Sequence, residues 1–236
     1  MSTRHKAVKT TLEKGYASEW NDDHESNFNT WINHEYLRPG PDLTAEWDIA
    51  QVVGASTVLW AMTANHAAVE LVTPANTDDI ATMRLELGAA VSNVTHPDDL
   101  PIMTFGLDID TVHDAAGVAN SVVEIGFQDD SDALFTVNQH HAIFRVYNGN
   151  LYGVTGDGAA ETETLIAAYS QYGQYRIEIL SDRVKFYVDD MVNAAATNTT
   201  HNPAADLTMK FSVRSKNNTA STIRIDGLAL ARLRKQ

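Results

Sequence analysis

The 236-residue sequence predicts an all-β fold, a two-sheet antiparallel β-sandwich with a short N-terminal helical arm. The clearest evidence is the stretch 175–190, YRIEILSDRVKFYVDD, in which apolar and polar residues alternate on both sides of Ser181-Asp182. Because side chains on a strand point to opposite faces in turn, this pattern indicates two half-buried strands joined by a tight turn. The Asn148-Gly149 pair within AIFRVYNGNLYGV is a strong hairpin signal of the same kind.

Residues 1–44 differ from the rest and are predicted to form the arm. The segment 15–37 has aromatic and apolar residues at spacings that fit one face of a helix: Trp20, Phe28, Trp31, Ile32 and Tyr36. Ser18 can cap this helix, and Pro39-Gly40-Pro41 ends it. Its aromatic face must cover a surface, either the chain's own β domain or another subunit. We therefore expect Trp20, Phe28 and Trp31 to serve in anchoring or oligomerisation.

Residues 45–236 are predicted to form the sandwich. Apolar and polar residues alternate in the segments 58–62, 83–87, 105–109, 123–127 and 207–213, and a return strand is expected around 134–137. In the last strand the apolar residues Ile223 and Ile225 fall at odd positions, whereas Leu228 and Leu230 fall at even positions. The slip falls at Asp226-Gly227, where a β-bulge is expected to restore the inward face.

Composition limits the partners. Hydrophobic residues make up 44% and charged residues 20%, which is ordinary for a globular protein. No apolar run approaches the roughly 18 residues of a membrane span, and the N-terminus lacks the apolar stretch of a secretion signal. The net charge of -14 argues against a nucleic-acid partner. Cysteine is absent, so disulfides and thiolate metal sites are excluded.

The order of these motifs carries a resemblance. The NG hairpin, the tyrosine-rich lead-in YSQYGQY, RIEI, VKFYVDD and the final DGLALARL together resemble concanavalin A-like and laminin-G-like jelly rolls over residues 45–234. Asp190 stands where those domains usually have Gly. Separately, KGYASEWNDDHE resembles a short segment near the N-termini of tail and virion-surface proteins of bacterial and archaeal viruses.

Two enzyme families of this fold offer partial matches. Laminarinase-type hydrolases carry Glu-x-Asp-x-x-Glu on a strand, and the matching region here, 107–114, has Asp108 and Asp110 with His113 or Asp114 near the acid position. The first carboxylate is thus Asp instead of Glu, and a solvated strand face is the expectation for this pair.

Alginate-lyase jelly rolls carry an Arg-x-Glu-Leu strand and a Gln-x-His strand, which resemble MRLEL at 83–87 and Gln139-His140-His141. A proton-abstracting His or Tyr beside a charge-neutralising Arg suits a polyuronate lyase. The lyases' third strand, rich in Tyr and Lys, has no clear counterpart, because Tyr169, Tyr172 and Tyr175 recur without the lysine. An acidic chain is also a poor host for a polyanion.

Asp129, Asp130 and Asp132 fall in one predicted hairpin turn and could supply oxygen ligands to calcium. Asp and Ser are also ordinary turn residues, and this simpler interpretation is the one we expect. No other cofactor is predicted.

The leading hypothesis from sequence is a non-enzymatic virion or surface structural protein, of a tail or capsid, whose lectin-like domain serves assembly or glycan adhesion. It predicts a homo-oligomer, contact with other virion or surface proteins and with a host glycan, and a location on the virion or extracellular surface. One alternative is a free carbohydrate-binding module that uses Tyr152, Tyr187 or Trp60, although Trp60 shares the phase of the core. The other is a carbohydrate-active enzyme, a glycoside hydrolase or a polyuronate lyase.

Overall fold

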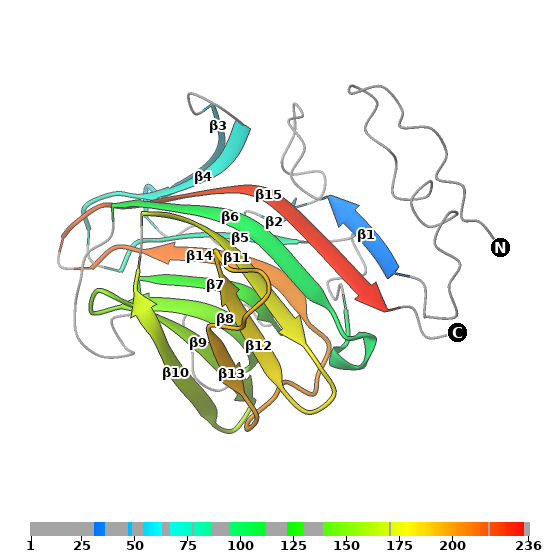
Figure 1. Cartoon of the computed structure of the whole chain (residues 1–236). Helices are drawn as coiled ribbons and strands as arrows, with labels where there is room; N and C mark the ends of the chain where they lie inside the picture. The colour runs from blue at the N-terminus through cyan, green and yellow to red at the C-terminus, as the bar shows by residue number, and fades with distance from the viewer. Residues whose placement is uncertain are drawn as a thin grey trace, which may run out of the picture.

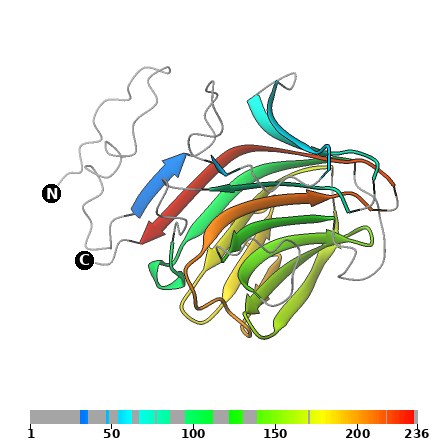
Figure 2. The same ribbon diagram turned by 180° about the vertical axis from the view of Figure 1, so that it is seen from behind.

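The computed structural model describes residues 31–35, 47–48, 54–62, 67–76, 78–85, 95–111, 122–129, 139–169, 171–216 and 218–233. Within them the chain forms two antiparallel sheets that face one another (Figures 1 and 2). A short 3-10 helix, η2 (Pro97–Asp99), lies between strands. In these residues, no helix is long and apolar enough to span a bilayer.

One sheet has eight strands. Along its main path they follow in the order β13 (Ala196–Asn198), β12 (Val184–Val188), β11 (Tyr172–Ile179), β6 (Ile102–Thr111), β15 (Ser221–Leu233), β4 (Ala67–Thr73) and β3 (Thr57–Met62). The eighth strand, β1 (Trp31–Glu35), pairs with the C-terminal half of β15, where Trp31 lies opposite Leu233 and Glu35 opposite Ala229.

The other sheet has seven strands, in the order β10 (Glu161–Ala168), β9 (Asn150–Asp157), β8 (His140–Tyr147), β7 (Val123–Gln128), β14 (Thr208–Arg214), β5 (Ile80–Leu85) and β2 (Trp47–Asp48). Figure 1 shows the eight-stranded sheet in front of it, and Figure 2 shows β14, β7 and β8 nearer the viewer. The alternation in the sequence therefore correctly predicts the two-sheet sandwich and both of its clearest hairpins, β8–β9 and β11–β12.

The core fills the space between the sheets. Its centre is a group of aromatic side chains from both sheets, Phe105, Phe144, Tyr175, Phe186 and Phe211, whose ring centroids lie 5.1–6.2 Å apart in successive contacts. Gly153 of β9 allows the sheets to approach here, because a Cβ at this position would lie 2.6 Å from the Phe186 ring. Burial of these large side chains drives association of the two sheets.

Asn198 joins the two sheets at their edge. Its side-chain amide on β13 donates to the carbonyl oxygens of Gly153 (3.1 Å) and Thr162 (3.1 Å) and to the hydroxyl of Thr155 (3.3 Å). Its Oδ1 accepts from the Thr164 hydroxyl at 2.7 Å. A buried amide with all of these partners fixes how β13 lies against β9 and β10.

The predicted bulge in the last strand is confirmed. The pairing of β15 with β6 shifts register between Asp226 and Ala229, and Gly227 has φ of 54°, which glycine adopts without strain.

The predicted N-terminal helix is wrong at its C-terminal end, because residues 31–35 form the strand β1. Backbone hydrogen bonds to β15 stabilise a strand here, whereas the predicted helix was supported only by the spacing of five apolar residues. Trp20 and Phe28, like the predicted return strand at 134–137, lie outside the described residues. The division into residues 1–44 and 45–236 remains a proposal.

Candidate functional site

The outer face of the seven-stranded sheet, turned away from the core, carries nine of the nineteen buried polar side chains among the described residues. Strand register places them in three rows that cross the sheet. The first row is Thr82, Ser212, Glu124, Arg145, Tyr152 and Leu165; the second is Arg84, Lys210, Gly126, Ile143, Val154 and Glu163; the third is Thr208, Gln128, His141, Gly156 and Glu161. We call these residues the polar face.

Burial falls along these rows toward β10. Lys210 and Arg145 have no exposed surface, and Gln128 exposes 3% of its own. In contrast, Leu165 on β10 is 57% exposed. The polar face is therefore open to solvent on the β10 side and closed at its centre.

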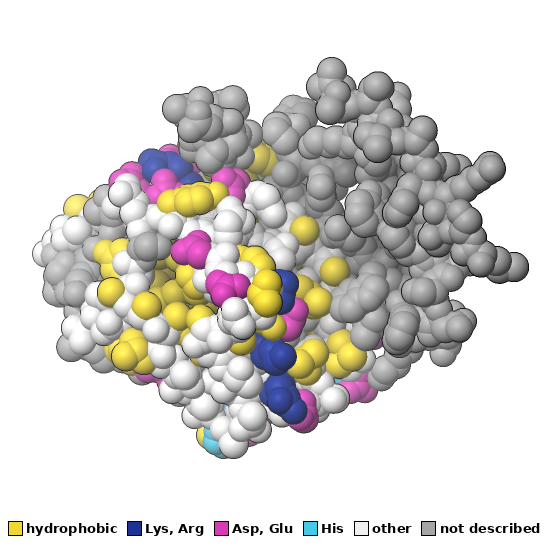
Figure 3. Space-filling view, in the orientation of Figure 1, with side chains coloured by type: hydrophobic (Ala, Val, Ile, Leu, Met, Phe, Trp, Pro, Cys, Tyr) yellow, Lys and Arg dark blue, Asp and Glu magenta, His cyan; other side chains and the backbone are white. Residues whose placement is uncertain are grey.

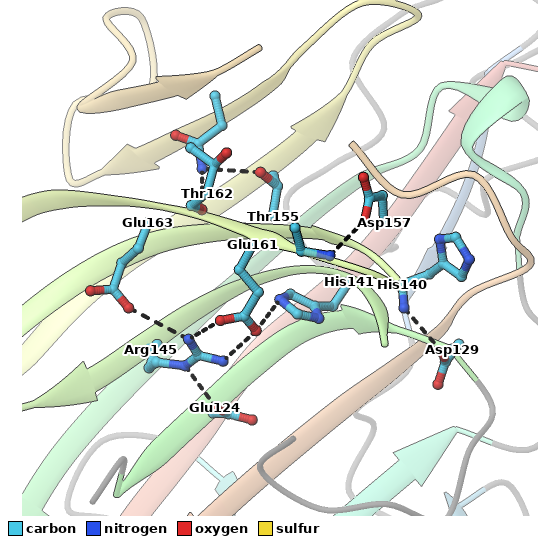
Figure 4. A network of polar contacts seen from close by, with 12 residues as sticks. Glu124, Asp129, His140, His141, Arg145, Thr155, Asp157, Glu161, Thr162 and Glu163 are labelled. Carbon is cyan, nitrogen blue, oxygen red and sulfur yellow. Dashed lines mark hydrogen bonds and ion pairs between the residues drawn. The ribbon is translucent and has the colours of Figure 1, made fainter. Parts of the chain in front are cut away.

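Arg145 is the centre of an ionic network (Figure 4). Its Nε lies 2.8 Å from Glu124 Oε1, and its two terminal nitrogens lie 2.9 and 3.0 Å from the two oxygens of Glu161. A longer contact of 3.5 Å reaches Glu163. The planar guanidinium thus binds carboxylates from β7 and β10 while it sits on β8 between them.

The contacts within this network determine the charge states of Arg145 and Glu161. Burial on its own lowers the pKa of Arg145, but the attraction of Glu124 and the hydrogen bonds to Glu161 outweigh burial and raise it, so Arg145 stays charged. Burial on its own raises the pKa of Glu161, but the contacts with His141 and Arg145 outweigh burial and hold that pKa at about 2. Glu161 is therefore a carboxylate at neutral pH and cannot donate a proton there.

His141 lies beside the network. Its Nε2 is 3.0 Å from Glu161 Oε1 across β9 (Figure 4), a close electrostatic contact that does not have the geometry of a hydrogen bond. The crossing is allowed because Gly156 has no side chain: a Cβ there would lie 2.5 Å from the His141 ring. The carboxylate favours the tautomer with the proton on Nε2, which leaves Nδ1 as the acceptor.

Two tyrosines lie near the open side of the polar face: Tyr152 in the first row, and Tyr147 two residues beyond Arg145 on the same face of β8. The rings of Tyr147 and Tyr152 stack with centroids 4.5 Å apart and planes 9° apart. The Tyr147 hydroxyl donates to Glu163. Burial first, and then the bond to Glu163, raise the pKa of Tyr147 well above its ordinary value, so this hydroxyl stays protonated at neutral pH.

Gln128 has an unexplained donor. Its side-chain Nε2 is buried and has no hydrogen-bond partner within the described ranges. Register places Gln128 between Thr208 and His141, and Lys210 lies one row away, opposite Gly126. A buried amide that lacks an acceptor destabilises the fold, which marks Gln128 as a candidate contact for a ligand.

The carboxylates that the sequence offered for hydrolysis lie elsewhere. Asp108 and Asp110 are on β6 in the eight-stranded sheet, where Arg224 binds both at 3.1 Å and also binds Glu70 at 2.7 Å. Figure 3 shows this side of the molecule, on which acidic and basic side chains lie next to one another. The pair is a partly exposed ion cluster on the sheet opposite the polar face.

The lyase-like segments are partly brought together. Arg84 and His141 both lie on the polar face, whereas Gln139 precedes β8. His140 points the other way, as its adjacency to His141 predicts, and its Nδ1 accepts from the Ala204 backbone N–H at 3.2 Å. Tyr175 belongs to the core.

The calcium prediction stays untested. Asp129 accepts a hydrogen bond from the His140 backbone N–H at 3.1 Å (Figure 4), while Asp130 and Asp132 lie outside the described residues. Within the described part of the chain, His, Asp and Glu side chains do not form a group of three suited to a metal ion.

The sequence did not single out Glu124, Gln128, Arg145, Lys210, Glu161 or Glu163. All are at positions where strand alternation predicts exposure to solvent. Polar side chains that are buried on the outer face of a sheet show the same alternation as exposed ones. The available signal was weak: one arginine within the otherwise apolar AIFRVY.

No family model and no curated protein matches the chain. Solved structures do. A β-glucanase of Bacillus licheniformis matches with a TM-score of 0.56 at 12% identity, over 87% of this chain and 98% of that one. The family 7 alginate lyase A1-II′ in complex with its substrate GGMG matches with 0.56 at 9% identity, over 83% and 96%. An alginate lyase of Corynebacterium sp. matches with 0.53 at 11% identity, over 78% and 93%.

These comparisons correct the functional prediction. The neighbours that share the fold over most of their length are a glucanase and alginate lyases, which contradicts a non-enzymatic virion or surface protein and favours the carbohydrate-active alternative. They lend no support to the resemblance to viral tail proteins. At 9–12% identity they show the fold alone, and that fold is a concanavalin A-like jelly roll.

Proposed function

We propose that this chain is a carbohydrate-active enzyme that cleaves a polyuronate by β-elimination on the polar face. The observation that carries the proposal is the buried, unpartnered amide of Gln128, one row from Lys210. Such a donor beside a cation suits a ligand that brings its own negatively charged oxygens. The carboxylate of a uronate residue is a ligand of this kind.

The chemistry requires two kinds of group. The uronate carboxylate must be neutralised so that the proton on the adjacent carbon becomes acidic. Gln128 can donate a hydrogen bond to it, and Lys210 and Arg84 in the neighbouring row add positive charge nearby. A base then removes that proton, the electron pair forms a carbon–carbon double bond, and the glycosidic C–O bond breaks. The leaving oxygen takes up a proton, so that no water is consumed.

His141 is the residue of the polar face best suited to be the base. Glu161 orients its ring through the 3.0 Å contact at Nε2, which leaves Nδ1 to accept a proton. Tyr147 cannot share this role at neutral pH, because its raised pKa keeps it protonated. The proton that His141 removes can pass to the leaving oxygen of the same linkage, whereas Tyr147 lies six residues further along β8, roughly 20 Å away.

The overall charge of -14 opposes a polyanionic substrate, but the charge on the polar face is balanced. Three basic residues (Arg84, Arg145 and Lys210) and three acidic residues (Glu124, Glu161 and Glu163) give a formal charge of zero among its described side chains. Since burial increases towards β14, a substrate reaches Gln128 from the β10 side. The long-range repulsion by the rest of the chain predicts faster association at higher salt.

Glycoside hydrolysis is the second candidate, because Glu124, Glu161 and Glu163 share this face. A hydrolase requires one carboxyl group that can donate a proton. All three carboxylates bind Arg145, and the pKa of Glu161 is held near 2, which weakens this alternative.

Incubation with alginate, polygalacturonate and a neutral β-glucan tests the proposal. We expect a product with a conjugated double bond from a polyuronate, and its formation should fall at least a hundredfold in Gln128→Met. The same variant should unfold at an unchanged or higher temperature, because it removes a donor that has no partner. Gln174→Ala is the matched control, an exposed amide on β11 of the other sheet. Full activity of Gln128→Met would refute the assigned role.

A further inference from the structure

The stacked pair Tyr147 and Tyr152 stands where the polar face becomes accessible. Tyr152 lies between buried Arg145 on β8 and Leu165 on β10, which is 57% exposed. Glu163, on the same face of β10, has a side chain 24% exposed. The tyrosines are thus partly exposed side chains on the route by which a ligand would reach the buried donors.

The two rings are stacked, and one of them is anchored at its hydroxyl. Their planes are 9° from parallel, the Tyr147 hydroxyl is bound to Glu163, and Glu163 is in contact with Arg145. A stacked pair that is anchored through the Tyr147 hydroxyl presents flat aromatic surface in a preferred orientation. Preorganised surface of this kind reduces the entropy lost on binding.

The edge strand is irregular at the same place. The pairing of β10 with β9 shifts register between Leu165, opposite Tyr152, and Ala167, opposite Leu151. A bulge on an edge strand turns nearby side chains and ends regular pairing. It therefore leaves the surface around Tyr152 and Leu165 less suited to an added β-strand from a partner protein.

We propose that Tyr152, with Tyr147 and Leu165, forms a subsite that stacks one pyranose ring of a polysaccharide. The inference rests on the proposed function, since it places this ring on the same chain that reaches Gln128. A pyranose has an apolar C–H surface bordered by hydroxyls. The aromatic rings and Leu165 pack against the C–H surface, and the Glu163 carboxylate accepts hydrogen bonds from the hydroxyls.

The test is calorimetric titration of the full chain with alginate and polygalacturonate oligosaccharides, and with a neutral β-glucan oligosaccharide. Tyr152→Ala should weaken binding of at least one of them about tenfold, while Tyr152→Phe, which keeps the ring, stays within a factor of about two. Tyr172→Ala is the control, an exposed tyrosine (50%) on β11 in the other sheet, and it should bind as the unchanged protein does.

If Tyr152→Ala fails to fold, Leu165→Ser addresses the same surface from an exposed position and should weaken binding several-fold. Unchanged affinity in a folded Tyr152→Ala, or no binding of any oligosaccharide by the unchanged protein, overturns the subsite. Its failure can be distinguished from failure of the proposed function. Double-bond formation with normal KM in Tyr152→Ala refutes only the subsite, whereas ring-dependent binding without turnover refutes only the lyase.

Discussion

Replacement of Arg145 by Met should destabilise the protein severely. The substitution keeps an unbranched side chain in a fully buried position but removes the cation that binds Glu124 at 2.8 Å and Glu161 at 2.9 and 3.0 Å. Loss of one partner from a buried ion pair costs about 3–5 kcal/mol, because the remaining charge keeps its desolvation penalty. For a chain of this size that corresponds to a melting temperature lower by roughly 6–20 °C.

The loss should depend on pH. The pKa of Glu161 is about 2 in the folded protein, below its ordinary value of 4.5, so its stabilisation is complete above pH 4.5 and disappears as the pH falls toward 2. At about 1.4 kcal/mol per unit, the shift corresponds to an upper bound of about 3 kcal/mol. Arg145→Met should therefore unfold much more easily than the unchanged protein at pH 7, and the gap should narrow at pH 3.

Urea denaturation followed by circular dichroism at both pH values measures this. Arg183→Met is the control, because Arg183 pairs with Asp182 on the surface, where both side chains are substantially exposed. Its midpoint should not move measurably. A difference below 1 kcal/mol for Arg145→Met at pH 7, or a gap that does not change with pH, would refute the assignment of Arg145 as the charge that holds the polar face together.

Three further outcomes are expected. Asn198→Ala should lower the free energy of unfolding, measured by urea denaturation, by about 2–3 kcal/mol, because the buried Asn198 amide bonds β13 to β9 and β10. A decrease below about 0.5 kcal/mol, less than one hydrogen bond typically contributes, would show that these bonds are dispensable. Deletion of residues 1–40 should leave a cooperative melt at a lower temperature, since β1 is lost but the core remains; a non-cooperative melt would contradict the proposed boundary. Calcium should not raise the melting temperature beyond matched sodium; a rise of several degrees that Asp130→Asn removes would establish a site worth about 2.7 kcal/mol at 100 times its dissociation constant.

Much of the fold follows from the sequence because most strands have one face in the core. Val184 and Phe186 alternate with Lys185 and Tyr187, and that period of two cannot be produced by a helix. The N-terminal segment lacked such a constraint: the spacing of Trp31 and Ile32 fits a helical face equally well. Only the pairing with Ala229–Leu233 of β15, some 200 residues away, makes these residues a strand.

The polar face could not be predicted in the same way. Lys210 alternates with Met209 and Phe211 as a solvent-exposed lysine would, yet it is fully buried. Its position depends on which strands lie beside β14, and the sequence does not show that β7 and β5 are these neighbours. The network around Arg145 likewise joins residues from three strands, so no local motif reveals it.

The most direct test of the account is cleavage of a polyuronate in water labelled with heavy oxygen, followed by mass spectrometry of the products. Elimination on the polar face, with His141 as the base, predicts products that contain a double bond and no heavy oxygen at the newly formed ends. His141→Ala should form them at least a hundredfold more slowly. Heavy oxygen at the new reducing ends, without a double bond, would identify a hydrolase, and the absence of any cleavage across the polysaccharides tested would contradict the enzymatic proposal itself.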